Sequence, residues 1–84
     1  MDEKERTLKD IEKLEKRLVF FKKHGLYERY LSVYECAHNY FLDAKHFFSE
    51  GKYFTAFGAA NYAYGFLDAV ITIEGKMDEK TDDR

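Results

Sequence analysis

Two pairs of residues in the middle of the chain have the spacing of a metal-binding motif. Glu35 precedes His38 by three positions, and Asp43 precedes His46 in the same way. Di-iron helical bundles use such carboxylate and imidazole pairs when they point inward and further Glu side chains come from other helices. Here the neighbouring rows of apolar residues place Glu35, Asp43 and His46 on the outside of a helix and His38 at the border of the core. We therefore expect surface and boundary residues at these positions, with no metal site and no cofactor.

The single cysteine, Cys36, stands two positions before His38. Residues two apart on a helix point about 200° away from each other, so the two side chains cannot form a nucleophile and base pair. A small, buried or half-buried side chain is the expected role of this cysteine. One cysteine forms no disulfide framework, which fits a reducing cytoplasm. The sequence shows no other catalytic constellation and favours a protein without enzymatic activity.

Basic residues are concentrated in the first part of the chain and offer a possible contact to nucleic acid. Glu12 and Glu15 lie among them, and the formal net charge of the chain is −2. Mixed charges of this kind are typical of a solvated helix face, whereas phosphate binding needs a patch of one sign. An RNA- or RNP-associated accessory protein is therefore the alternative reading, and nucleic acid is not the favoured partner. The candidate contacts are Lys13, Lys16, Arg17, Lys22 and Lys23.

Helical periodicity runs through most of the 84 residues, and the chain contains no proline. The apolar spacing predicts helices over residues 3–23, 26–50 and 53–74. In the first of these, the core row is Leu8, Ile11, Leu14, Leu18 and Phe21. Glycines that can close a helix follow the three segments at Gly25, Gly51 and Gly75. Both connections are short, so the sequence predicts an all-α fold, an up-down-up three-helix bundle with antiparallel neighbours.

The length fits one domain, expected over residues 1–76. Residues 77–84 are mostly charged and are predicted to form a flexible tail, because they offer too little apolar surface to repay ordering. No apolar run reaches the roughly 18 residues of a membrane span, and the first residues do not resemble a signal peptide. We expect a cytoplasmic protein without membrane contact.

The third helical segment carries a single charged residue, Asp68, between Tyr53 and Ile73. A helix with a charged back lies on a surface, whereas a helix that is uncharged all round is expected to be covered all round. So short a chain cannot cover a helix on every side, and the uncovered face therefore predicts a partner. That face is formed by mostly small and uncharged residues, Thr55, Gly58, Tyr62, Gly65, Ala69 and Thr72. Together with Asp68, these six residues are the predicted interaction surface.

An acid within such a helix should be paired or lie at an edge. For Asp68 we expect a hydrogen bond to a tyrosine hydroxyl or a pairing with Lys or Arg, within the chain or across a subunit boundary. The other reading makes Asp68 a polar anchor in a ligand cleft with Tyr62 and Tyr64. The sequence leaves this second reading open.

The residues from Asn39 to Asp68 closely resemble a known family signature. The resemblance rests on four motifs: Asp43-Ala44, Gly51-x-Tyr53, Ala56-Phe57 and Tyr62-Ala63-Tyr64-Gly65-x-Leu67-Asp68-Ala69. The chain thereby resembles a family of short archaeal proteins catalogued as domain of unknown function number 357. Phe66 stands where this family often has Trp, and Val70 where it often has Gly. The resemblance implies an archaeal, cytoplasmic helical bundle and brings no activity and no catalytic residue.

The sequence thus favours a helical protein-interaction module that self-associates through its third helical segment, with a dimer as the expected form. A protein partner of another kind is also compatible with the uncharged face. The RNA-associated protein is the alternative, and a binder of a small molecule or metal ranks third.

Overall fold

The computed structural model describes residues 2–75 and contains four helices in this range, with no strand. They are α1 (Glu3–Lys23), α2 (Leu26–Arg29), α3 (Leu31–Ser49) and α4 (Tyr53–Ile73). The all-α class is therefore confirmed. The tail predicted over residues 77–84 lies outside the described residues.

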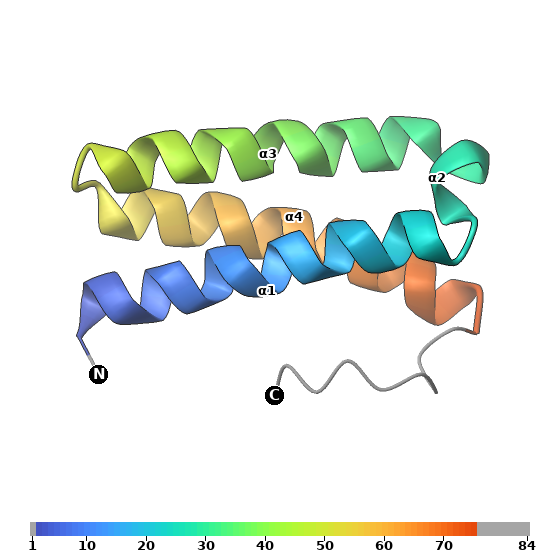
Figure 1. Ribbon diagram of the computed structural model, residues 1–84, viewed down its shortest axis with the longest axis horizontal. Helices are drawn as coiled ribbons and strands as arrows, with labels where there is room; N and C mark the ends of the chain where they lie inside the picture. Colours follow the sequence, from blue (N-terminus) through green and yellow to red (C-terminus); the bar gives the residue numbers. More distant parts are fainter. Residues whose placement is uncertain (1, 76–84) are drawn as a thin grey trace.

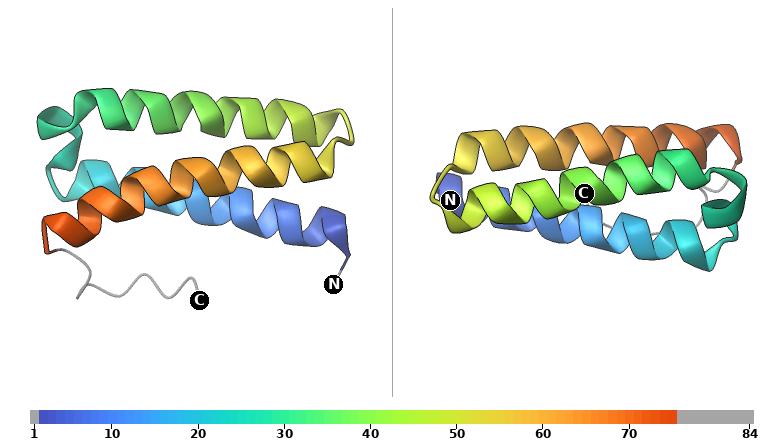
Figure 2. Two further views of the ribbon diagram at one scale, coloured as in Figure 1. Left: turned by 180° about the vertical axis from the view of Figure 1, so that it is seen from behind. Right: turned by 90° about the horizontal axis from the view of Figure 1, so that it is seen from above.

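The three long helices pack side by side, and consecutive long helices run in opposite directions (Figure 1). α1 and α3 are thus antiparallel, and α4 runs parallel to α1. Figure 2 shows α4 across the back of the molecule, where it contacts both α1 and α3 on one side. The single-turn helix α2 stands between α1 and α3 at one end.

Tight glycine turns separate α1 from α2 and α3 from α4, as the sequence predicts. Gly25 has φ +74° and Gly51 has φ +80°, in the left-handed region that side chains with a Cβ rarely adopt. At the other end of α1, the Asp2 carboxylate accepts a hydrogen bond of 2.8 Å from the backbone N–H of Glu5. This bond satisfies one of the free donors at the start of the helix.

The second predicted helix is not continuous, and this corrects the expected count of three helices. Tyr30 has φ −128° and ψ 48°, which interrupts the helical backbone between α2 and α3. Neither glycine nor proline marks the position. The break lets Leu26 enter the core, where it is buried, while the following Leu31 is exposed.

A polar clamp holds this break against the end of α4. The Arg29 guanidinium donates two hydrogen bonds to the Glu74 carboxylate, at 2.8 and 3.2 Å, and the Tyr30 hydroxyl donates a third. Glu74 directly follows α4, so the clamp ties two points of the chain that are 44 residues apart in sequence. The bond to Glu74, followed by burial, raises the pKa of Tyr30 above its usual value.

The core is built from large side chains of α1 and α3 around a row of small ones on α4. Phe21 and Leu14 of α1 are fully buried, and Phe41 of α3 is nearly so. The small residues of α4 on this side are Ala56, Ala60 and Ala63, all without exposed surface, and Ala60 and Ala63 belong to the same buried cluster as Phe21 and Phe41. Small side chains let helices approach closely, and the rings then fill the space on either side.

The buried residues of α1 differ from the predicted core row. Leu8 is partly exposed, whereas Thr7 is buried in its place. The Thr7 hydroxyl lies 2.8 Å from the Glu3 carbonyl oxygen and 3.3 Å from that of Tyr53, so it finds backbone acceptors on two helices. Phe20, which lies outside the predicted row, is also buried.

The clamp predicts a pH dependence at the alkaline end. Because the folded state raises the pKa of Tyr30, the stabilisation is complete below the pKa of the unfolded chain and is lost as pH rises through the folded pKa. We expect the free energy of unfolding to fall more steeply in the wild type than in Tyr30→Phe as the pH rises above about 10, the usual tyrosine pKa. Urea titrations followed by circular dichroism measure this difference. Parallel pH profiles for the two proteins would contradict it.

Candidate functional site

The candidate surface lies on the side of α4 that faces away from the other helices. We call it the outer face and define it by the six predicted residues, all of which are exposed: Thr55, Gly58, Tyr62, Gly65, Ala69 and Thr72. Figure 2 shows that no other described helix crosses this side of α4. Two large apolar side chains flank the outer face at its ends, Phe54 with 79% of its surface exposed and Ile73 with 77%. Tyr62, at 56% exposed, lies near the middle.

The two glycines of the outer face are not required by packing within the chain. A Cβ atom built on Gly58 or Gly65 would meet no other atom within 4 Å. The small residues that admit the rings of α1 and α3 are the buried alanines instead. In the middle of a helix, each glycine costs about 1 kcal/mol relative to alanine. The chain carries this cost at two positions without any compensating contact inside the described molecule.

A shallow groove adjoins the outer face on the side toward α3. It has a volume of about 450 Å³ and is lined by one charged residue, Asp43, and by six uncharged ones, Tyr40, Phe47, Thr55, Gly58, Ala59 and Tyr62. The rings of Tyr40 and Tyr62 meet edge to face with their centroids 5.1 Å apart. This arrangement keeps Tyr62 beside the groove and leaves part of its ring accessible. The walls are mainly aromatic and small apolar side chains, which suits an apolar occupant.

Asp68, the seventh predicted site residue, lies at the edge of α4 toward α1 and not on the outer face. Its carboxylate Oδ1 is 3.5 Å from the Arg17 guanidinium, and this atom accepts no direct hydrogen bond. The Arg17 side chain is only 4% exposed, against 31% for Asp68. The expected pairing of Asp68 with a Lys or Arg is therefore confirmed within one chain.

The Tyr64 hydroxyl completes this cluster between α1 and α4. It accepts hydrogen bonds from Arg17 Nε at 3.1 Å and from Arg17 Nη2 at 2.9 Å. The Arg17 guanidinium also lies 5.0 Å from the centre of the Tyr64 ring. The structure brings Tyr64 and Asp68 together through Arg17, whereas Tyr62 is on a different side of α4. The predicted ligand cleft of Tyr62, Tyr64 and Asp68 is therefore wrong as a single site.

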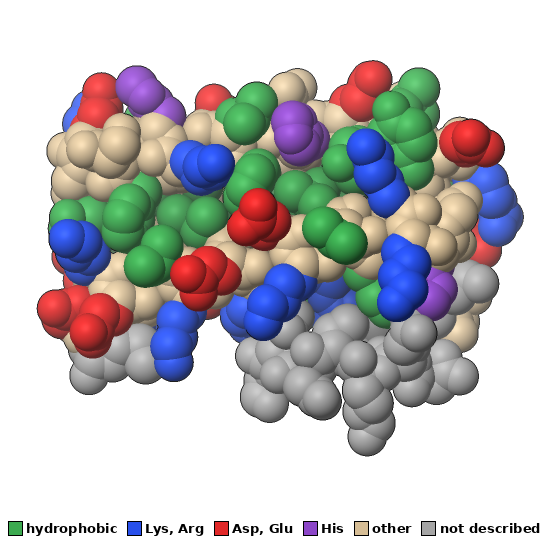
Figure 3. All heavy atoms as spheres, in the orientation of Figure 1, with side chains coloured by type: hydrophobic (Ala, Val, Ile, Leu, Met, Phe, Trp, Pro, Cys, Tyr) green, Lys and Arg blue, Asp and Glu red, His purple; other side chains and the backbone are tan. Residues whose placement is uncertain are grey.

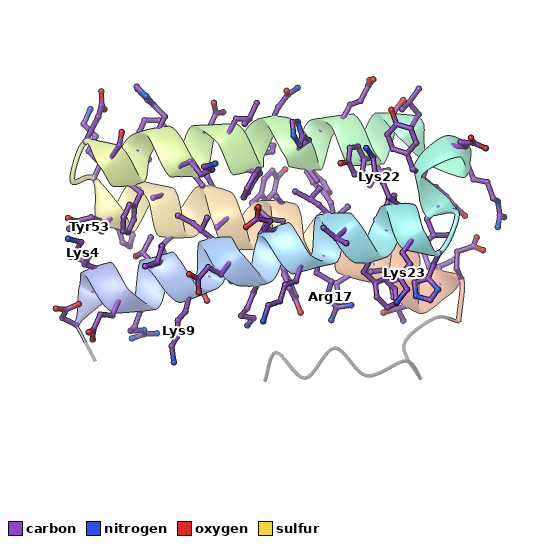
Figure 4. All side chains as sticks on the ribbon, in the orientation of Figure 1. Lys4, Lys9, Arg17, Lys22, Lys23 and Tyr53 are labelled. Carbon is purple, nitrogen blue, oxygen red and sulfur yellow. The ribbon has the colours of Figure 1, made fainter. Side chains whose placement is uncertain are left out.

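The basic residues predicted as a nucleic-acid contact do not form one face. Arg17 is buried, and Figure 4 shows its side chain leaving α1 on the side away from α3, whereas Lys22 lies between α1 and α3. Lys22 Nζ is 4.9 Å from the centre of the Tyr27 ring. In the view of Figure 3, acidic and basic side chains alternate over α1 and α3. Sequence reasoning missed the burial of Arg17, because its position on the helix borders the charged face.

The predicted placement of the carboxylate and histidine pairs is confirmed. Glu35, Asp43 and His46 are exposed, and His38 is half-buried. His46 Nε2 lies 3.2 Å from the Glu50 carboxylate. Within residues 2–75, no group of three or more His, Cys, Asp or Glu side chains is arranged to hold a metal ion.

A family model described as "Protein of unknown function (DUF357)" matches residues 9–75. The chain belongs to this family, as the motifs between Asn39 and Asp68 indicate. No curated protein and no solved structure matches the chain. None of the helices over the described range 2–75 has both the length and the apolar character needed to cross a membrane.

The Arg17 cluster predicts a measurable role for Asp68 in stability. Asp68→Ala removes the carboxylate beside a buried guanidinium, and we expect it to lower the free energy of unfolding by about 1–3 kcal/mol. In an Arg17→Met background the same change should cost clearly less, because no buried charge remains to be balanced. Chemical denaturation of the four proteins measures both effects. A wild-type unfolding curve for Asp68→Ala would contradict this role.

The outer-face glycines give the opposite prediction. Gly58→Ala and Gly65→Ala should each raise the free energy of unfolding of the single chain by about 0.5–1 kcal/mol, since alanine is the better helix former and meets no obstacle. Gly51→Ala is the matched control and should destabilise by about 1–2 kcal/mol, because its φ is positive. Urea denaturation at a concentration where the chain is monomeric compares the three. If Gly65→Ala lowered the free energy of unfolding as much as Gly51→Ala, packing within the single chain would require Gly65.

Proposed function

We propose that this chain is a non-enzymatic helical protein-interaction module that self-associates through the outer face of α4. The observation that carries the proposal is an exposed, uncharged face along the whole length of α4. Tyr62 on this face, and Phe54 and Ile73 at its two ends, remain more than half exposed in the single chain. Contiguous apolar surface of this kind marks a contact site in soluble proteins.

The composition of the face supports a protein partner over a charged one. Protein interfaces are depleted of charge at their centre and enriched in aromatic side chains. The outer face has no Lys, Arg, Asp or Glu, and the only acid on α4 is held by Arg17 at its edge. The location that we propose with this function is the cytoplasm of an archaeal cell, which the family resemblance and the single cysteine support.

The alternative, an RNA-associated protein, has less support. Of the five basic residues considered, Arg17 is engaged with Tyr64 and Asp68, and Lys13 lies 5.2 Å from the centre of the Tyr64 ring. A binder of small molecules would use the groove beside Gly58. This groove is continuous with the outer face, so we assign it to the same protein contact.

The mass of the native protein tests the proposal. We expect light scattering at micromolar concentration to give a mass above the 10.0 kDa of one chain. Gly65→Glu should reduce it to the monomer, because a charge at the centre of the face would have to be buried without a partner. The circular dichroism of this variant should remain helical, since glutamate is a better helix former than glycine.

Asn39→Glu is the matched control for this experiment. It places the same charge at an exposed position in the middle of α3, so it should leave the mass unchanged. A monomer mass for the wild-type protein, or an equal loss of association in both variants, would contradict association through α4.

A further inference from the structure

The outer face of α4 has the spacing of a coiled-coil seam. Its residues Thr55, Gly58, Tyr62, Gly65, Ala69 and Thr72 follow alternate steps of three and four. A strict repeat of this kind gives a straight contact line along two helices that cross at a small angle. The seam begins near the first residue of α4 and ends near its last. Two copies of α4 can therefore meet along their full length.

The order of large and small residues along this seam is complementary to itself in the antiparallel direction. About a midpoint between Ala63 and Tyr64, Tyr62 lies level with Gly65 of the second copy, and Gly58 lies level with its Ala69. Thr55 likewise meets Thr72. Each layer thus combines Tyr62 with a glycine or joins two small residues, so no layer has to hold two large rings.

The parallel direction lacks this complementarity. It would place Tyr62 level with Tyr62 of the other copy and Gly65 level with Gly65, so crowded and empty layers would alternate. An antiparallel pair related by a twofold axis is also the closed, self-complementary arrangement that most homodimers adopt.

The exposed ends of the outer face gain neighbours in the same register. Thr55 and Ile73 lie at equivalent angles around α4, on the side toward α3, because 18 residues make five helical turns. In the antiparallel pair, Ile73 of the second copy comes beside Thr55, next to the groove whose wall holds the rings of Tyr40, Phe47 and Tyr62 and the exposed carboxylate of Asp43. The groove thereby receives an apolar side chain that the single chain leaves 77% exposed.

The surface available is sufficient for a stable pair. The exposed parts of Phe54, Tyr62 and Ile73, together with the small residues between them, amount to roughly 600 Å² per copy, which gives a total near the lower end of specific interfaces. No charge of either copy enters the seam, so burial leaves no unpaired ion.

We infer that two copies of this chain pair through α4 as an antiparallel, twofold-symmetric seam centred between Ala63 and Tyr64. This inference rests on the proposed self-association and adds its partner, direction and register. The partner is a second copy, and the contact brings Thr55 of one chain to Thr72 of the other.

Engineered cysteines test the register. In a Cys36→Ser background, one chain carries Thr55→Cys and another carries Thr72→Cys, and both are exposed positions. When the two chains are mixed and oxidised, the dominant product should be the disulfide between the cysteine at position 55 of one chain and the cysteine at position 72 of the other. Each chain alone should cross-link poorly, since the two Thr55 positions lie about 25 Å apart along the antiparallel pair. Mass spectrometry of non-reduced peptides identifies the bond, and Ser32→Cys with Thr72→Cys is the unmatched control.

The outcomes separate the inference from the proposed function. Dominant self-cross-linking of Thr55→Cys with itself would show a parallel pair, and it would overturn the register while self-association stands. A dimer mass together with a Thr55–Thr72 cross-linking yield no higher than that of the Ser32 control would also overturn the register, while self-association stands. A monomer mass for the cysteine-free background and for the wild-type chain would overturn both.

Discussion

Only one side of α4 can be covered by its own chain, and the rest of the structure follows from this constraint. The helix has two neighbours, α1 and α3, and both pack against the same side, where they also contact each other. The alanines at positions 56, 60 and 63 form that side and have no exposed surface. They allow α1 and α3 to approach α4 closely enough for Phe21 and Phe41 to close the core between them.

The buried Arg17 shows how the same packing governs polar groups. Its position on α1 borders the charged face, but α4 lies so close that the guanidinium enters the contact. A charge taken out of water must be matched, and the matching groups come from α4, where the Tyr64 hydroxyl and the Asp68 carboxylate lie one helical turn apart. The only acid of α4 is therefore explained by the only buried cation of the described chain.

The spacing of apolar residues was sufficient to predict the all-α class, the bounds of α1 and α4 to within one residue, and the exposure of the outer face. It could not predict the break at Tyr30, because nothing in the local sequence disfavours a helix there. At the break, Arg29 and Tyr30 bond to Glu74, which is more than 40 residues away in sequence. The prediction placed Leu8 in the core where the structure has Thr7, because the periodicity fits both positions. Only the nearby Tyr53 carbonyl, which accepts a hydrogen bond from the Thr7 hydroxyl, favours the burial of Thr7. Contacts between distant elements decide such positions.

Comparison of α1 with α4 separates the needs of the fold from those of a partner. Both helices have 21 residues and each buries seven of them. The outward side of α1 is charged, as solvent exposure favours, and this charged side is compatible with the fold. Nothing in the packing of α4 would prevent the same charged outward side, because a Cβ at Gly58 or Gly65 meets open space. The fold therefore does not account for an uncharged, glycine-containing face with large apolar side chains at its ends. The contact that we propose would account for it, because such a contact excludes charge and uses the close approach that glycine permits.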